Sequence, residues 1–188
     1  MQFAKDSFFL ALQQRLGALN PARTVTVNGT TVPAVLVVEN LPPASSEPQA
    51  NAFYIEWGAA KVQCGGSGAG ALMSVQCVIS YYTLGTVASM VDRGRVLGQL
   101  DDELLGICQP LNTEKMDYSQ APSVDLGTKV FWDQPTFEQA TTSGVEDETL
   151  AYQGRGVRRA MYEQAHQDGR VDRRAKLTVF FFSEVTLS

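Results

Sequence analysis

The stretch Leu72-Met-Ser-Val-Gln-Cys-Val-Ile-Ser-Tyr-Tyr-Thr-Leu84 decides the fold. Its β-branched and aromatic side chains favour a β-strand. A second strand-like run, Phe53–Val62, precedes it, and the glycine-rich residues 64–70 lie between the two. We therefore predict a long β-hairpin in which these two strands pair through a flexible connection.

A second hairpin is predicted upstream, where Asn28-Gly29 lies between Thr24–Val27 and Thr31–Glu39. Both central residues of the favoured two-residue turn need a positive φ, which Asn and Gly tolerate. Pro33 indicates a sheet edge or a bulge, because proline cannot donate a hydrogen bond to a neighbouring strand.

Two segments show helical periodicity. In residues 7–19 apolar side chains recur at helical spacing, and Asp6 or Ser7 is placed to cap the first amides. Residues 86–108 carry a second apolar stripe, in which Gly94 and Gly98 are expected to mark close packing against the sheet. The apolar positions of the two stripes are Phe8, Phe9, Leu12, Leu16, Leu19, Val87, Met90, Val91, Leu97, Leu104 and Cys108.

The last part of the chain is mixed in character. Ala175–Val185 predicts a final strand, and residues 155–166 predict a short helix. Residues 109–153 are largely polar and are predicted to form a long irregular insertion. Within it, Lys129–Trp132 and Thr136–Gln139 predict one small hairpin.

Strand runs that are separated from helices indicate an α+β fold. We expect a single domain over residues 1–188, with a mostly antiparallel sheet and the two main helices packed on one of its faces. The strands expected in this sheet are Thr24–Glu39, Phe53–Val62, Leu72–Leu84 and Ala175–Val185.

The residue types that catalysis requires are scarce. The one histidine, His166, lies among polar residues, so neither an HExxH zinc site nor a multi-histidine site can form. Residues 65–70 lack the Gly-Lys-Ser/Thr ending of a phosphate loop, and no serine occupies a G-x-S-x-G elbow. We expect no enzyme activity, cofactor or metal, and we expect the acidic residues 101–103 to be exposed helical surface.

The composition, with 44% hydrophobic residues and a net charge of −5, suits a soluble globular protein without general attraction to nucleic acid. No apolar run approaches the roughly 18 residues of a membrane span, and the N-terminal stretch is too short for a secretory signal. Cys64, Cys77 and Cys108 are interpreted as buried reduced thiols, with disulfides between subunits as the alternative.

Residues 155–176 are rich in arginine although the chain is acidic. Solvated surface, contact with a neighbouring subunit and contact with phosphates all stay open. We predict the second, because arginine suits bidentate pairing with carboxylates and this basic segment follows an acidic one in the sequence. The predicted interface residues are Arg155, Arg158, Arg159, Arg173, Arg174, Glu146, Asp147 and Glu148. Loops 40–51, 63–71 and 109–153 are also expected to contact partners.

Four stretches carry a resemblance to a known family: residues 6–24, Met73–Thr83, Val91–Leu105 and Lys176–Val185. A leading helix, a strand that runs into a second helix and an apolar closing strand resemble the tail-terminator (tail-completion) proteins of tailed bacteriophages and related phage-tail-like particles. The resemblance covers about 60% of the chain in pattern.

This resemblance implies a non-enzymatic virion subunit that forms a ring, usually a hexamer. The ring would cap the head-proximal end of the tail tube, end tube polymerisation and dock the tail to the neck.

The partners that the resemblance implies are copies of the chain itself, the tail tube protein, neck or connector proteins and the sheath protein of a contractile tail. DNA would pass through the lumen without sequence-specific binding, and no membrane would be involved. The expected location is the tail or neck of the virion, after assembly in the host bacterial cytoplasm. Another neck or head–tail connector subunit and a small enzyme-accessory domain are the alternatives.

Overall fold

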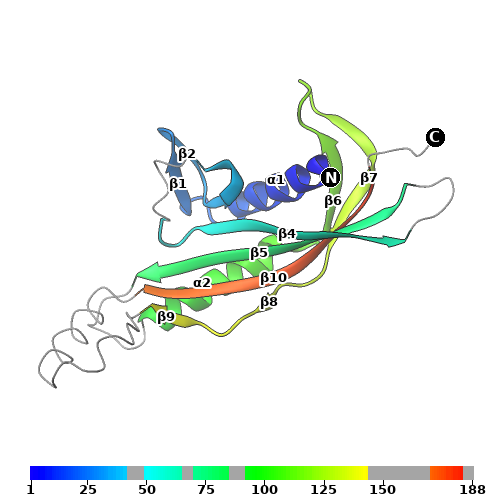
Figure 1. The fold of residues 1–188 in the computed structure, drawn as a ribbon. Helices are drawn as coiled ribbons and strands as arrows, with labels where there is room; N and C mark the ends of the chain where they lie inside the picture. The colour runs from blue at the N-terminus through cyan, green and yellow to red at the C-terminus, as the bar shows by residue number, and fades with distance from the viewer. Residues whose placement is uncertain (42–48, 65–69, 85–91, 144–169, 184–188) are drawn as a thin grey trace, which may run out of the picture.

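The computed structural model describes residues 1–41, 49–64, 70–84, 92–143 and 170–183 of the 188-residue chain. These residues form an α+β fold, which confirms the predicted class (Figure 1). In the described part, one eight-stranded sheet carries the helices, and a separate two-stranded hairpin lies beside it. The sheet contains, in spatial order, β3 (Val35–Val37), β4 (Phe53–Cys64), β5 (Leu72–Leu84), β10 (Arg170–Phe182), β7 (Val124–Trp132) and β6 (Asn112–Asp117), while β8 (Thr136–Phe137) and β9 (Thr141–Ser143) pair with β10.

The centre of the sheet is the long antiparallel pair β5 and β10. They pair from Arg170 opposite Leu84 to Phe182 opposite Leu72. Odd-numbered positions such as Cys77 and Val179 are buried on the face that meets the helices. Because side chains alternate along a strand, the even-numbered positions of β10 lie on the opposite face, where they are exposed or half-buried. We call this second surface the open face.

Both helices pack on the same face of the sheet, as predicted. Helix α1 (Gln2–Leu19) places Phe8 in edge-to-face contact with Trp57 and Trp132, whose register partners lie on the helix side. Helix α2 (Asp92–Ile107) buries four side chains in the same core. These residues are Leu97, Leu100, Leu104 and Ile107.

The start of α1 differs from the prediction. The helix begins at Gln2, and Met1 at its N-cap makes no side-chain hydrogen bond. Ser7 lies inside the helix: its hydroxyl donates to the carbonyl of Phe3 at 2.7 Å and accepts from the amide of Met116 at 2.9 Å. Capping by Asp6 or Ser7 was therefore the wrong interpretation, because the Ser7 hydroxyl is bonded within the helix and to β6. The apolar stripe also ends early, since Leu19 is 54% exposed.

The glycines of α2 contradict a second expectation. A Cβ added at Gly94 or Gly98 would meet nothing within 4 Å, so neither residue marks close packing against the sheet. The described part of this helix begins at Asp92, and residues 86–91 of the predicted helix lie outside the described residues.

The Asn28-Gly29 turn is confirmed. The two residues have φ values of 50° and 79° and form the turn that connects β1 (Thr24–Val27) to β2 (Thr30–Pro33). However, this hairpin forms its own two-stranded sheet. Of the predicted strand segment Thr24–Glu39, only β3 (Val35–Val37) joins the main sheet. The chain leaves the hairpin at Pro33, where proline ends β2. It then enters β3, which runs parallel to β4, before a short 3-10 helix, η1 (Val38–Asn40).

The prediction of an irregular insertion at 109–153 was wrong for the described residues of that range. They supply β6, β7, β8 and β9 to the main sheet. The small hairpin predicted from Lys129–Trp132 and Thr136–Gln139 does not form either, because β7 and β8 each pair with β10. The predicted helix at 155–166 and most of loops 40–51 and 63–71 lie outside the described residues.

Candidate subunit interfaces

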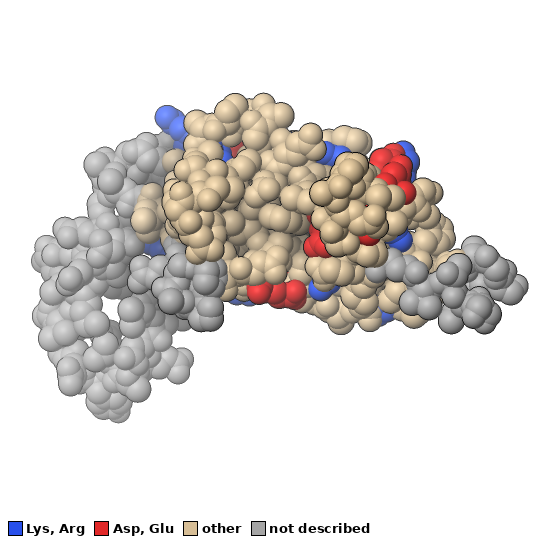
Figure 2. Space-filling view, turned by 90° about the horizontal axis from the view of Figure 1, so that it is seen from above, with Lys and Arg blue, Asp and Glu red and all other residues tan. Residues whose placement is uncertain are grey.

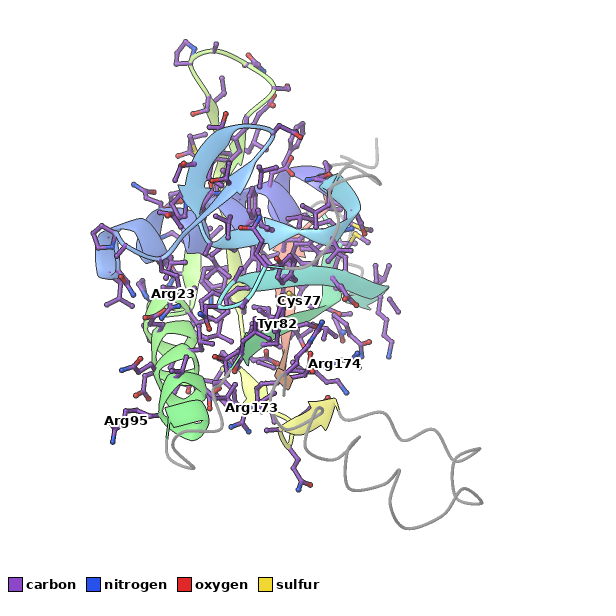
Figure 3. The ribbon with its side chains drawn as sticks, turned by 90° about the vertical axis from the view of Figure 1, so that its left-hand side faces the viewer. Arg23, Cys77, Tyr82, Arg95, Arg173 and Arg174 are labelled. Carbon is purple, nitrogen blue, oxygen red and sulfur yellow. The ribbon has the colours of Figure 1, made fainter. Side chains whose placement is uncertain are left out.

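The predicted interface residues fall into two groups. Six of them, at positions 146–148, 155, 158 and 159, lie outside the described residues. Arg173 and Arg174 are neighbours on β10, so their side chains point to opposite faces of the sheet (Figure 3). The predicted contact between these arginines and acidic residues therefore lies largely outside the described residues and stays a prediction.

Arg173 is engaged inside its own chain. Its Nη2 lies 3.0 Å from Asp101 Oδ2 and its Nη1 donates to the carbonyl of Glu138 at 3.0 Å. The other oxygen of Asp101 accepts a hydrogen bond from the Tyr81 hydroxyl. Burial, followed by this bond to Asp101, raises the pKa of Tyr81. The cluster joins β10, α2 and β5, so its first role is to hold the helix on the sheet.

The acidic run 101–103 is thus only partly exposed surface. Glu103 forms an ion pair with Arg23 and accepts a hydrogen bond from the Asn20 side chain at 2.7 Å. Asp101 and Glu103 are both half-buried, and Asp102 alone of the three is exposed. The prediction of a solvated surface was wrong for the two outer residues, because each faces a cation from a distant segment.

The open face carries an aromatic patch that the sequence analysis missed. Phe131 of β7 pairs with Phe180 of β10, and Phe182 follows two residues later on the same face. Phe131 is 43% exposed and Phe182 is 39% exposed. The sequence Phe180-Phe181-Phe182 could have indicated an exposed phenylalanine, since three consecutive phenylalanines in a strand cannot all face one core. We call Phe131, Phe180 and Phe182 the aromatic patch.

A second candidate surface is the β6–β7 arm, residues 117–126, which projects beyond the body of the molecule (Figure 1) and lies within the range 109–153 that was expected to contact partners. Tyr118, Val124 and Leu126 are each exposed by 36% or more. Hydrogen bonds organise the turn: Asp117 Oδ1 accepts from the Ser119 amide at 2.9 Å and hydroxyl at 2.6 Å. These bonds, with one more from Gln120, lower the pKa of Asp117.

Charges on the upper surface are scattered. Seen from above (Figure 2), the lysines, arginines and acidic residues of the described part of the chain lie in small groups among uncharged side chains. That view shows no continuous row of cations along which a nucleic-acid backbone could lie.

In the ranges that the structure describes, no group of three or more His, Cys, Asp or Glu side chains could hold a metal ion. Among the same residues, neither helix is long and apolar enough to cross a membrane.

Two of the cysteines match their interpretation as buried thiols. Cys77 and Cys108 are free and almost fully buried, while the side chain of Cys64 lies outside the described residues. Burial raises the pKa of the Cys108 thiol to about 12, an effect that Arg15 partly offsets. Burial also raises the pKa of Cys77.

We predict that Cys77 and Cys108 of the native protein react with a thiol reagent only after unfolding. The thiolate is the reactive form, and burial disfavours it. In the unfolded chain Cys108 ionises near its ordinary pKa of 9, so its contribution to stability is complete below pH 9 and falls as pH rises toward 12. Reagent titration of a Cys64→Ser variant, with and without denaturant, checks this. Rapid labelling of either thiol in the native variant would contradict the described burial.

Comparisons with known proteins give a distant likeness among solved structures. No protein-family model matches the sequence, and no curated protein matches it. Among solved structures, a chain from the virion of a native gene transfer agent particle is similar over 95% of this chain and 98% of that chain. The two share 18% sequence identity, with a TM-score of 0.36. A likeness at this level carries no inference about the role of this chain.

Proposed function

We propose that this chain is a non-enzymatic structural subunit that assembles with copies of itself into a ring. The observation that carries the proposal is the presence of two separate exposed apolar surfaces, the aromatic patch and the β6–β7 arm. Exposed apolar side chains that gather on one surface are typical of protein contacts. Two different surfaces on one chain favour a head-to-tail contact, which closes into a ring when the rotation permits.

The specific role proposed for this ring is that of a tail terminator at the head-proximal end of a phage tail tube. The family resemblance supports this role. Its four stretches contain most of β5, α1, α2 and β10, which together supply the central strands and the helix layer. The resemblance therefore concerns the core of the fold and not only its surface loops. The ring would end tube polymerisation and offer a docking surface to neck proteins, with DNA passing through its lumen.

Removal of the subunit from assembling particles tests this role. Without it, we expect tubes of uncontrolled length that are not joined to heads, because nothing stops polymerisation. Resupplying the wild-type chain should restore a single tube length in electron micrographs. Gold-labelled subunit should lie at the head-proximal end of each tube. Normal tube lengths without the chain, or label that lies only within the neck, would contradict the terminator role.

A further inference from the structure

The last of the described strands in chain order, β10, lies at the centre of the main sheet. It pairs with β5 along one edge and with β9, β8 and β7 in turn along the other. We propose that β10 is the closing strand of this fold: the residues before it do not reach the native state until β10 has been synthesised and has docked between β5 and β7. This inference concerns folding and does not rest on the proposed ring.

Without β10 the main sheet would fall into separate pieces. Its spatial order joins β3, β4 and β5 to β7 and β6 through β10 alone, and in the described chain β8 and β9 have no other strand partner. The facing edges of β5 and β7 would then carry unpaired backbone amides and carbonyls. Such groups are costly when they are buried, and they are prone to wrong pairing when they are exposed. The earlier strands therefore need β10 in order to form one sheet.

The hydrophobic core also depends on β10. Its odd-numbered side chains from 175 to 181 face the helices, and none of the four is more than 4% exposed. These residues are Ala175, Leu177, Val179 and Phe181. Burial of apolar side chains is the main favourable contribution to folding, and the net stability of a domain is small beside it. A chain that lacks these four side chains and their strand pairing is therefore not expected to hold the fold.

Helix α1 cannot replace this connection. It bridges the two parts of the sheet on one face, through the contacts of Phe8 with Trp57 of β4 and Trp132 of β7. Contacts between side chains leave the backbone groups at the facing edges of β5 and β7 unpaired. Trp132 is itself held in register by β10, where it lies opposite Val179. The ion pair that ties α2 to the sheet also ends on β10.

The closing strand completes the aromatic patch as well. Phe180 and Phe182 belong to β10, whereas Phe131 belongs to β7. A chain that stops before β10 would therefore lack most of this exposed surface. In the proposed ring, such a chain would be kept out of the assembly. Only this consequence rests on the proposed function.

Arrest of the chain on the ribosome during synthesis tests the closing strand directly. The chain is followed by a flexible linker and a sequence that stalls translation. A short linker keeps β10 inside the exit tunnel and a long linker releases it. Residues 1–143 are outside in both cases, because residues 144–169 separate β9 from β10. Brief protease digestion measures the intact fraction. We expect the short-linker chain to be cut as fast as a denatured chain, and the long-linker chain to resist as the released protein does.

Two substitutions in the long-linker chain separate the docking of β10 from its emergence. Val179→Asp places a carboxylate where the side chain is fully buried, so β10 should fail to dock and the protection should be lost. Arg174→Asp is the matched control, because Arg174 is an exposed position of the same strand, and this chain should stay protected.

The other outcomes overturn the inference. Equal protection of the short-linker and long-linker chains would show that the earlier residues fold without β10. A long-linker chain that is digested while the released protein resists would show that the emergence of β10 does not complete the fold. Protection of the Val179→Asp chain would show that the core face of β10 need not dock. Rapid digestion of the released protein would contradict the described fold, and the inference with it. Failure of the proposed ring would leave all these expectations unchanged.

Discussion

Replacing Phe8 by alanine is expected to lower the free energy of unfolding by about 3–5 kcal/mol. Phe8 is fully buried, and its ring lies 5.6 Å from that of Trp57 and 5.0 Å from that of Trp132, edge-to-face in both cases. The substitution removes the apolar contact area and leaves a cavity where α1 meets two strands of the sheet. Because interiors are closely packed, the surroundings can fill only part of that cavity.

Urea unfolding followed by tryptophan fluorescence measures this effect. The chain has two tryptophans, and both contact Phe8, so the signal reports on the site itself. Phe9→Ala is the matched control: this neighbouring phenylalanine is only half-buried and should cost less. Equal losses at the two positions would show that α1 does not present Phe8 to the core as described.

The second large effect is expected at Asp101. Asp101→Ala should cost about 2–4 kcal/mol, because it leaves the Arg173 guanidinium and the Tyr81 hydroxyl without their shared acceptor. Both side chains of the ion pair are about one-fifth exposed, so solvent replaces the lost contacts only in part. The resulting variant should also loosen α2, which the pair ties to β10.

Asp102→Ala is the control for this prediction, since Asp102 is adjacent and exposed and should change stability by no more than about 0.5 kcal/mol. A double-mutant cycle with Arg173→Ala isolates the pair. We expect strongly non-additive losses, because either single change breaks the same interaction. Additive losses, or a cost at Asp102 equal to that at Asp101, would contradict the cluster.

The parts of the fold that could be predicted from the sequence are those with local signals. Asn28-Gly29 carries its own turn chemistry, and Leu72–Leu84 matches β5 at both ends. The closing strand was predicted from Ala175, whereas β10 begins at Arg170. The mostly polar residues 170–174 show no hydrophobic pattern, but their pairing with β5 holds them in the sheet.

The features that were missed depend on contacts between distant segments. In β7, only Val130 and Trp132 are buried, so most of the strand shows no alternation of buried and exposed side chains. Its partner strand β10 is about fifty residues away in the sequence, so no local pattern indicates the pairing. Ser7 looked like a helix cap because its bond to Met116 cannot be read from neighbouring residues. The pairing of β3 with β4 is parallel and likewise has no local signature.

The candidate surfaces show the same division. Charge patterning pointed to Arg173, but its partner Asp101 is on another element and belongs to the same chain. The aromatic patch combines Phe131 with residues of β10, a combination that follows only from the strand order. Sequence reasoning could find an exposed phenylalanine in Phe180–Phe182, but it could not find the neighbour that makes it a patch.

The most direct test of the ring is the native mass of the purified chain. The account predicts one closed species whose mass is a whole multiple of the 20.5 kDa subunit, six by the family resemblance, unchanged as concentration rises. A closed ring leaves no unpaired contact surface at which it could grow further. A protein that remains at 20.5 kDa at every concentration, or one that forms an open series of ever larger species, would contradict the proposed ring.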